Sequence, residues 1–157
     1  MSKHHKHKRN KQHFIAVVTD RVKARGERMT ELRLDVLNLL LQQTNPIGAY
    51  DLRDKLNSQK EKANEKKIEP ASIYRCLDFL VSLGVVVKLE SQNAFILCEH
   101  VDEQHQHVLM LCNGCGATAE LHDDVAVRRL DKNAISLGFT PQHHVLEIHG
   151  TCRECQA

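Results

Sequence analysis

The chain has 157 residues, 41% of them hydrophobic and 27% charged, which is the balance of a folded protein with one or two domains. No apolar run approaches the roughly 18 residues that span a bilayer, and no secretion signal is recognisable, so we expect neither a membrane protein nor a secreted precursor. The formal net charge of +2 is unevenly distributed, because residues 1–13 carry basic side chains and no acidic one.

The first segment, residues 1–13, has no hydrophobic periodicity and is predicted to be a disordered basic tail that is rich in histidine. Such a composition is typical of arms that bind nucleic acid and equally of solvated tails. The histidines of the tail could bind metal weakly or could simply be solvated.

Apolar side chains then recur twice at helical spacing. One stripe occupies residues 14–22 and ends at Gly26, and a second occupies residues 32–40, with Thr30 as a suitable N-cap. Both patterns predict short amphipathic helices.

Two further helices are predicted downstream. Residues 48–57 form the third, and the polar segment 58–67 is predicted to be an exposed loop. Pro70 suits the first position of the fourth helix, and Gly84 suits the position just beyond its end.

After the fourth helix the hydrophobic period changes to that of strands. Residues 85–90 and 94–97 read as two strands around a polar turn, which predicts a β-hairpin. Several short helices followed by a hairpin predict a winged helix-turn-helix domain over residues 14–98.

A second unit follows a hinge at residues 99–106. Within residues 107–157 we predict a strand at 107–111, a helix at 123–137 and a strand at 144–149. The predicted fold class is therefore α+β, with a winged helix-turn-helix followed by a small α/β domain.

The strongest chemical signal is a pair of C-x-x-C motifs. Cys112 and Cys115 follow one predicted strand, and Cys152 and Cys155 follow another. Two such turns can complete a tetrahedral shell of four thiolates, which favours zinc, with an iron–sulfur cluster or unrelated thiols as alternatives. A closed shell has no open coordination position, so the expected zinc site is structural rather than catalytic.

A second, looser cluster of potential ligands lies around the hinge. It includes Cys98, His100, Glu103, His105, His107, Glu120 and His122, with His143, His144 and His149 further along. These side chains could form a mixed S/N/O metal site that links the two units, or they could be a solvated, histidine-rich connection. Cys76, by contrast, is predicted to be a small buried residue.

The outer face of the fourth helix is a candidate surface for DNA. Ser72, Tyr74 and Arg75 lie near its N-terminal end, where a helix-turn-helix enters the major groove. The alternative is an ordinary solvated helix face. The arginines that are candidates for the phosphate backbone are Arg25, Arg28, Arg33 and Arg53.

Together these segments resemble the ferric uptake regulator family, and specifically its zinc uptake regulator branch. The resemblance covers about residues 14–155. It rests on the motifs Met29–Arg33, Ala49–Leu52, Pro70–Leu80, Glu90-Ser91, Cys98, Cys112–Gly116 and His144–Cys155. It implies a bacterial, cytoplasmic homodimer that represses transcription when it is loaded with metal, with a C-terminal dimerisation domain. It implies no enzymatic activity.

The resemblance also implies two zinc ions per subunit. It places structural zinc at the four cysteines of the C-x-x-C motifs, and regulatory zinc at a site that Cys98, His105 and Glu120 match. The hinge histidine of the zinc branch is absent, because Val87 stands at its position. His107 is our first candidate for the fourth ligand and His100 our second.

For DNA, the resemblance implies contacts from Tyr74 and Arg75 and a reach to a base edge from Tyr50. We therefore expect a zinc-responsive repressor that binds double-stranded operator DNA of zinc-uptake genes. The alternatives are an iron- or peroxide-responsive regulator of the same family and a histidine-rich protein that stores or delivers zinc.

Overall fold

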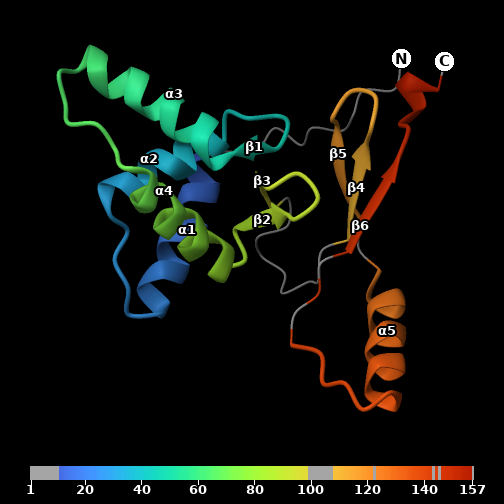
Figure 1. Cartoon of the computed structure of the whole chain (residues 1–157). Coiled ribbons are helices and arrows are strands. Elements are labelled where there is room, and N and C mark those ends of the chain that lie inside the picture. The colour runs from blue at the N-terminus through green and yellow to red at the C-terminus, as the bar shows by residue number, and fades with distance from the viewer. Residues whose placement is uncertain (1–10, 99–107, 122, 143, 145, 157) are drawn as a thin grey trace.

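The computed structural model describes residues 11–98, 108–121, 123–142, 144 and 146–156, and the statements below concern these residues. Four helices and a small sheet form the N-terminal part, while a second sheet and one helix form the C-terminal part (Figure 1). The predicted α+β class and its two-part order are confirmed. Among the described residues, no helix has the length and apolar character needed to cross a membrane.

The N-terminal helices pack their apolar stripes into one core. They are α1 (Lys11–Ala24), α2 (Glu31–Leu40), α3 (Ala49–Lys62) and α4 (Pro70–Ser82). Val18, Val36, Leu52 and Leu77 are fully buried between them. The predicted cap of α2 is confirmed, since the Thr30 hydroxyl accepts a hydrogen bond from the Arg33 N–H at 3.3 Å.

Two helix boundaries differ from the prediction. The helix α1 begins at Lys11, so the last residues of the predicted tail are helical, and α3 continues to Lys62 through half of the segment predicted to be a loop. Lysine, glutamine and glutamate are good helix formers that need no burial, which a search for apolar periodicity cannot detect. The end of α3 is also held by Lys60, which pairs with Glu65 at 2.6 Å and with Asp35 at 3.7 Å.

The predicted hairpin is present and forms a wing. β2 (Val86–Leu89) pairs antiparallel with β3 (Ala94–Leu97), and Asn93 in the turn has a positive φ of 46°. A two-residue strand, β1 (Ile47–Gly48), adds to the other edge of β3 and was not predicted. The wing therefore packs on the helical core, with Phe95 buried.

The second sheet has the order β5-β4-β6. Its strands are β4 (Val108–Cys112), β5 (Thr118–Leu121) and β6 (Leu146–Gly150), and β6 runs parallel to β4 while β5 runs antiparallel. The helix α5 (Asp124–Ser136) lies between β5 and β6 in the chain, and a short 3-10 turn, η1 (Arg153–Cys155), follows β6. The strand β5 was missed because it is short and half exposed.

The two faces of this sheet have different environments. On one face, Leu109 and Leu111 pack with Leu89 of the wing. On the other face, Met110 and Ile148 lie opposite each other in register and are both exposed, Ile148 by 50%. One face thus contacts the N-terminal part, and the other presents apolar side chains to solvent in the single chain.

Candidate metal centres and nucleic-acid interface

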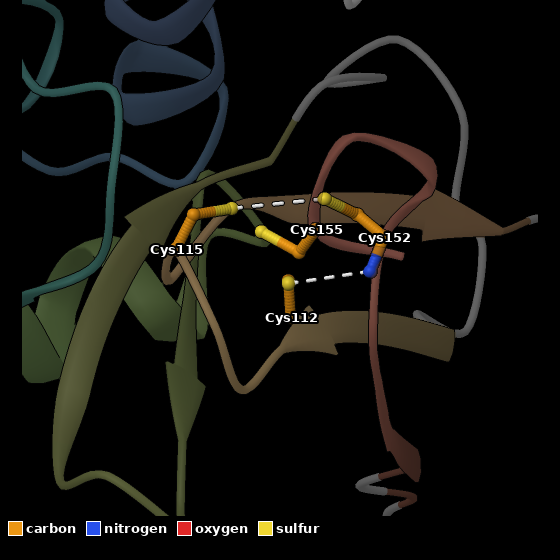
Figure 2. A group of neighbouring side chains, drawn as sticks. All are labelled: Cys112, Cys115, Cys152 and Cys155. Atoms are coloured by element: carbon orange, nitrogen blue, oxygen red, sulfur yellow. Dashed lines mark hydrogen bonds between the residues drawn. The ribbon is translucent and has the colours of Figure 1, made fainter. Parts of the chain in front are cut away.

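The four cysteines of the two C-x-x-C motifs lie together at one end of the second sheet (Figure 2). Cys112 ends β4 and Cys115 lies in the following turn, while Cys152 precedes η1 and Cys155 is its last residue. Because β4 and β6 are adjacent and parallel, both turns leave the sheet at the same edge. All four sulfur atoms lie within 4.8 Å of one another.

This spacing suits a tetrahedral zinc ion. A Zn–S distance of about 2.3 Å corresponds to sulfur–sulfur separations of about 3.8 Å in a tetrahedron. The Sγ atoms of Cys115 and Cys152 are 3.8 Å apart. The donor set therefore fits zinc in both its chemistry and its spacing.

Hydrogen bonds from backbone amides favour the thiolate form of Cys112. Its Sγ accepts a hydrogen bond from the Cys152 N–H at 3.2 Å, and this contact, with those from the amides of Cys115 and Gly114, lowers the pKa of Cys112 to about 6. Side-chain hydrogen bonds with Cys152, Cys115 and Cys112 favour the protonated thiol and raise the pKa of Cys155 to about 12, and burial and the charge of Cys112 add to this effect. A cation is the group that lets all four deprotonate together.

Gly114 lies against this shell, and replacing it with alanine is expected to weaken zinc binding there. The added methyl group would lie 3.1 Å from Cys155 Sγ and 3.2 Å from Cys155 Cβ, so the thiol would have to move by a few tenths of an ångström. We expect zinc affinity to fall by roughly 10-fold, which is a typical loss when a residue that holds metal ligands in position is changed. Competition with a chromogenic chelator measures this.

Gly150→Ala is the matched control for that substitution. Gly150 lies in β6 close to Cys152, and an added Cβ there meets nothing within 4 Å. Equal zinc affinities for the two variants would contradict the steric argument.

At the boundary of the two units the structure brings together two predicted ligands of the second site. Cys98 is 1% exposed and follows β3 of the wing, and Glu120 lies in β5. Cys98 Sγ is 3.7 Å from Glu120 Oε1 and 4.0 Å from Oε2. A thiol from one unit and a carboxylate from the other therefore face each other.

The other candidates of the second cluster are distributed differently. His144 bonds to Asp131 of α5 at 2.7 Å, and His149 to Glu147 at 3.3 Å. Within the described part of the chain, neither belongs to a group of three potential ligands. The remaining members lie outside the described residues; these are His100, Glu103, His105, His107, His122 and His143.

The candidate DNA surface is formed by α4 and the start of α3. Arg75 is exposed, and its guanidinium donates to the Ser72 hydroxyl at 3.2 Å. Tyr74 makes an edge-to-face contact with Tyr50, with ring centroids 6.2 Å apart, and Tyr50 is 56% exposed. Arg53 lies 5.3 Å from the Tyr50 ring centroid and pairs with Asp54 at 2.6 Å.

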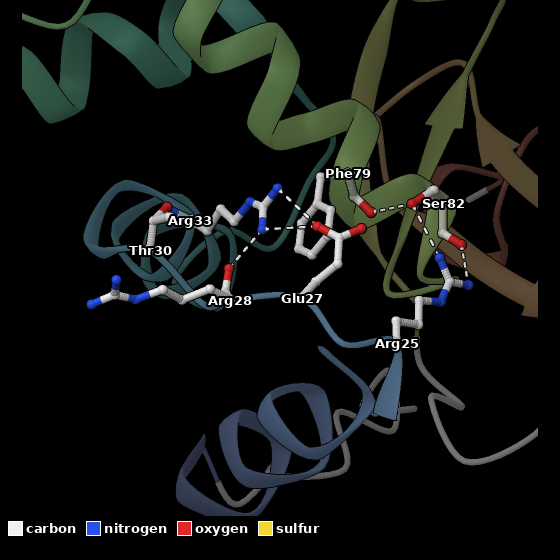
Figure 3. Close-up of polar contacts among 7 residues, drawn as sticks. All are labelled: Arg25, Glu27, Arg28, Thr30, Arg33, Phe79 and Ser82. Atoms are coloured by element: carbon white, nitrogen blue, oxygen red, sulfur yellow. Dashed lines mark hydrogen bonds and ion pairs between the residues drawn. The ribbon is translucent and has the colours of Figure 1, made fainter. Parts of the chain in front are cut away.

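Two of the arginines that are candidates for the phosphate backbone also make contacts within the chain (Figure 3). The Arg33 guanidinium stacks 3.3 Å from the ring centroid of Phe79 and donates to the backbone carbonyl of Arg28 at 2.6 Å. Arg25 donates to the Ser82 carbonyl at 2.7 Å, at the C-terminal end of α4, where helix carbonyls attract cations. Both arginines thus fasten α4 to the helices that precede it.

Comparison with known proteins adds an independent line of evidence. A family model described as the ferric uptake regulator family matches residues 24–149. The zinc uptake regulation protein of Escherichia coli strain K12 is 37% identical over 132 residues, which cover 83% of this chain and 74% of that protein.

Solved structures agree with the family match. A zinc uptake regulator complexed with zinc and DNA is similar to this chain with a TM-score of 0.86 at 34% identity, covering 94% of this chain and 95% of that chain. Holo XcZur gives a TM-score of 0.79 at 37% identity, covering 93% of this chain and 98% of its own. Its apo form, at 38% identity, covering 94% of this chain and 98% of its own, gives only 0.53. The chain as a whole is therefore more similar to the holo form than to the apo form.

Proposed function

This chain belongs to the ferric uptake regulator family, and on that premise we propose that it represses zinc-uptake genes when its homodimer carries zinc. It is a zinc-responsive DNA-binding regulator and not an enzyme. The observation that carries the proposal is the contact of Cys98 with Glu120 across the boundary of the two units. An ion held by ligands from both units links metal binding to the arrangement of the units, and so to DNA binding.

The chemistry of this pair favours zinc over harder cations. The iron-responsive alternative would be better served by an oxygen ligand where Cys98 stands, because a thiolate is the softer donor. We propose Cys98, His105 and Glu120 as regulatory ligands, with His107 as the first candidate for the fourth and His100 as the second. Together with structural zinc at Cys112, Cys115, Cys152 and Cys155, this makes two zinc ions per subunit.

We propose that residues 14–98 and the helical extension to Lys11 form the DNA-binding domain, residues 99–106 the hinge, and residues 107–157 the dimerisation domain. Ligation by Cys98 and Glu120 stabilises one arrangement of the two domains. In a dimer, that arrangement sets the spacing of the two α4 helices, which must match half-sites about one helical turn apart. Zinc and DNA therefore favour the same state, and each strengthens binding of the other.

The test is the metal dependence of DNA binding by the full chain. An operator duplex is first selected from a random-sequence pool with the zinc-loaded protein, and its affinity is then measured in buffers of zinc, iron or manganese. We expect tight, sequence-specific binding at the lowest free concentration with zinc. A preference for iron would favour the alternative regulator, and no sequence preference would favour storage or delivery.

Substituting Arg75 tests the proposed reading surface. We expect Arg75→Ala to weaken binding of the operator duplex by about 10-fold and to relax sequence preference, as for an arginine that reads guanine. Fluorescence anisotropy with the selected duplex and with a scrambled duplex measures both effects. Lys23→Ala, on the exposed side of α1, is the charge-matched control, and an equal loss in the two variants would indicate a general effect of charge.

The exposed apolar face of the second sheet fits the dimer interface. Met110, Ile148 and Leu121 lie on this face, and α5 adds Val125 and Ile135, all exposed in the single chain. Exposed apolar side chains of this kind are typical of a homodimer interface.

We expect Ile148→Lys to weaken dimerisation by about 10-fold or more, because an unpaired ammonium would have to be desolvated. Sedimentation velocity over a range of protein concentrations measures the change. The control Gln59→Lys adds the same charge on the exposed side of α3 and should leave the dimer intact. Dimers of equal strength in both variants would place the interface elsewhere.

A further inference from the structure

A carboxylate of the second sheet holds the tip of the wing. Glu147, in β6, has a side chain that is only 9% exposed, and its Oε1 accepts the backbone N–H of Glu90 at 2.7 Å and of Ser91 at 3.5 Å. Both amides lie in the turn between β2 and β3. The other carboxylate oxygen faces His149 Nε2 at 3.3 Å.

The carboxylate is held in its charged form. Burial by itself raises the pKa of Glu147, but the hydrogen bonds from the Ser91 hydroxyl and from the backbone of Glu90 and Ser91 outweigh it and lower the pKa. Hydrogen bonds to an ionised acceptor are about twice as strong as neutral ones. The negative charge therefore strengthens the hydrogen bonds that join Glu147 to the turn between β2 and β3.

The strand register places Glu147 in one row with a proposed zinc ligand. Leu109 of β4 lies opposite Glu120 on one side and opposite Glu147 on the other, so the three side chains share the face that meets the wing. Glu120 faces Cys98 at the end of the hairpin away from the turn, and Leu109 packs with Leu89 between the two contacts. The wing is thus attached at both ends, once through proposed zinc ligands and once through Glu147.

We propose that Glu147 is a positioning residue that latches the wing to the dimerisation domain without metal and so favours the arrangement that zinc and DNA select. The inference rests on the proposed function and deepens it. The latch raises the fraction of molecules in the binding-competent arrangement before zinc binds. Losing it lowers that fraction, and the apparent affinities for zinc and for DNA fall by the same factor.

The test compares Glu147→Ala and Glu147→Gln with the parent in the full chain. In Glu147→Ala we expect faster hydrogen exchange at the amides of Glu90 and Ser91. We also expect roughly 10-fold weaker binding of the operator duplex when the regulatory site is empty, and a similar loss of zinc affinity at that site, whereas saturating zinc should restore duplex binding. Glu147→Gln should be intermediate, because its amide oxygen still accepts the two N–H groups but without the charge.

Asp20→Ala is the control for the change in net charge, since Asp20 lies on α1 and is 79% exposed. Removing an acidic side chain from a DNA-binding protein strengthens phosphate attraction, so weaker binding in the Glu147 variants cannot arise from charge alone. Zinc content at the four cysteines and the dimer state should equal those of the parent, which separates positioning from misfolding.

Unchanged exchange at Glu90 and Ser91 would overturn the latch, and faster exchange with unchanged affinities would overturn its positioning role. Failure of the proposed function gives a different result. In that case the parent itself shows no zinc response in DNA binding, while the exchange measurement still reports whether Glu147 holds the wing.

Discussion

Cys112→Ser is expected to empty the four-thiol site and to abolish operator binding. Cys112 is the thiol that the amides of Cys152, Cys115 and Gly114 favour as a thiolate. The two cysteines outside the shell, Cys76 and Cys98, are not placed to replace it. Losing one ligand of four should lower zinc affinity by roughly 10²- to 10³-fold. This factor corresponds to about a quarter of the binding free energy that is typical of structural zinc. The turns after β4 and β6 then lose the ion that joins them.

The consequence extends to the dimer and to DNA. The same two strands carry Met110 and Ile148 of the proposed interface. Loss of zinc at the end of these strands should therefore also weaken the dimer. Zinc analysis after dialysis, sedimentation velocity and duplex binding measure the three effects. Cys76→Ala is the control, because Cys76 is buried in the N-terminal core and belongs to neither proposed site. A Cys112→Ser protein with full zinc content would contradict the assignment.

Cys98→Ala is expected to separate folding from regulation. The four-thiol site is untouched, so the protein should keep one tightly bound zinc per chain and remain dimeric. The thiol that faces Glu120 is lost, and with it the soft donor of the regulatory site. We expect the zinc-induced gain in operator affinity, typically about 5- to 150-fold for coupled sites, to disappear.

Zinc stoichiometry, together with duplex binding at high and low free zinc, tests this expectation. Glu120→Gln should produce a weaker version of the same loss, because an amide oxygen is a poorer zinc ligand than a carboxylate. Cys76→Ala again serves as the matched cysteine control. If Cys98→Ala kept two zinc ions and a full zinc response, regulation would have to depend on other residues.

The sequence predicted the helical part of the fold well where burial decides it. The apolar stripe of α4, its Pro70 start and the glycine after its end all appear as expected, with Gly84 at a positive φ of 68°. The prediction was wrong where exposed side chains determine the length of a helix, as at the end of α3. It also missed β1 and β5, which form through very short strand pairings. Helix propensity and edge pairing leave no periodic apolar signal.

The candidate sites divide in a similar way. Two C-x-x-C motifs, each after a predicted strand, were sufficient to predict that four thiols meet, because each short turn by itself presents two sulfurs to one ion. The contact between Glu147 and the tip of the wing was not predictable, although the alternation in residues 144–149 was visible. Alternation indicates that Glu147 and Ile148 face opposite sides of a sheet, but not that one side meets the wing.

Arg25 and Arg33 have a structural role that the sequence did not indicate, in addition to the phosphate contacts expected of them. The structure places Arg33 over Phe79 and Arg25 at the end of α4. No local pattern distinguishes an arginine that binds DNA from one that supports the helix that does.

The most direct test of the account is the affinity of the full chain for the operator duplex at buffered free zinc, with the four-thiol site filled throughout. We predict that the affinity for the duplex rises steeply as the second zinc ion per chain binds. The rise in duplex affinity and the filling of the second zinc site should have their midpoints at the same free zinc concentration. Equal affinity before and after the second zinc binds would show that an ion between Cys98 and Glu120 does not control DNA binding.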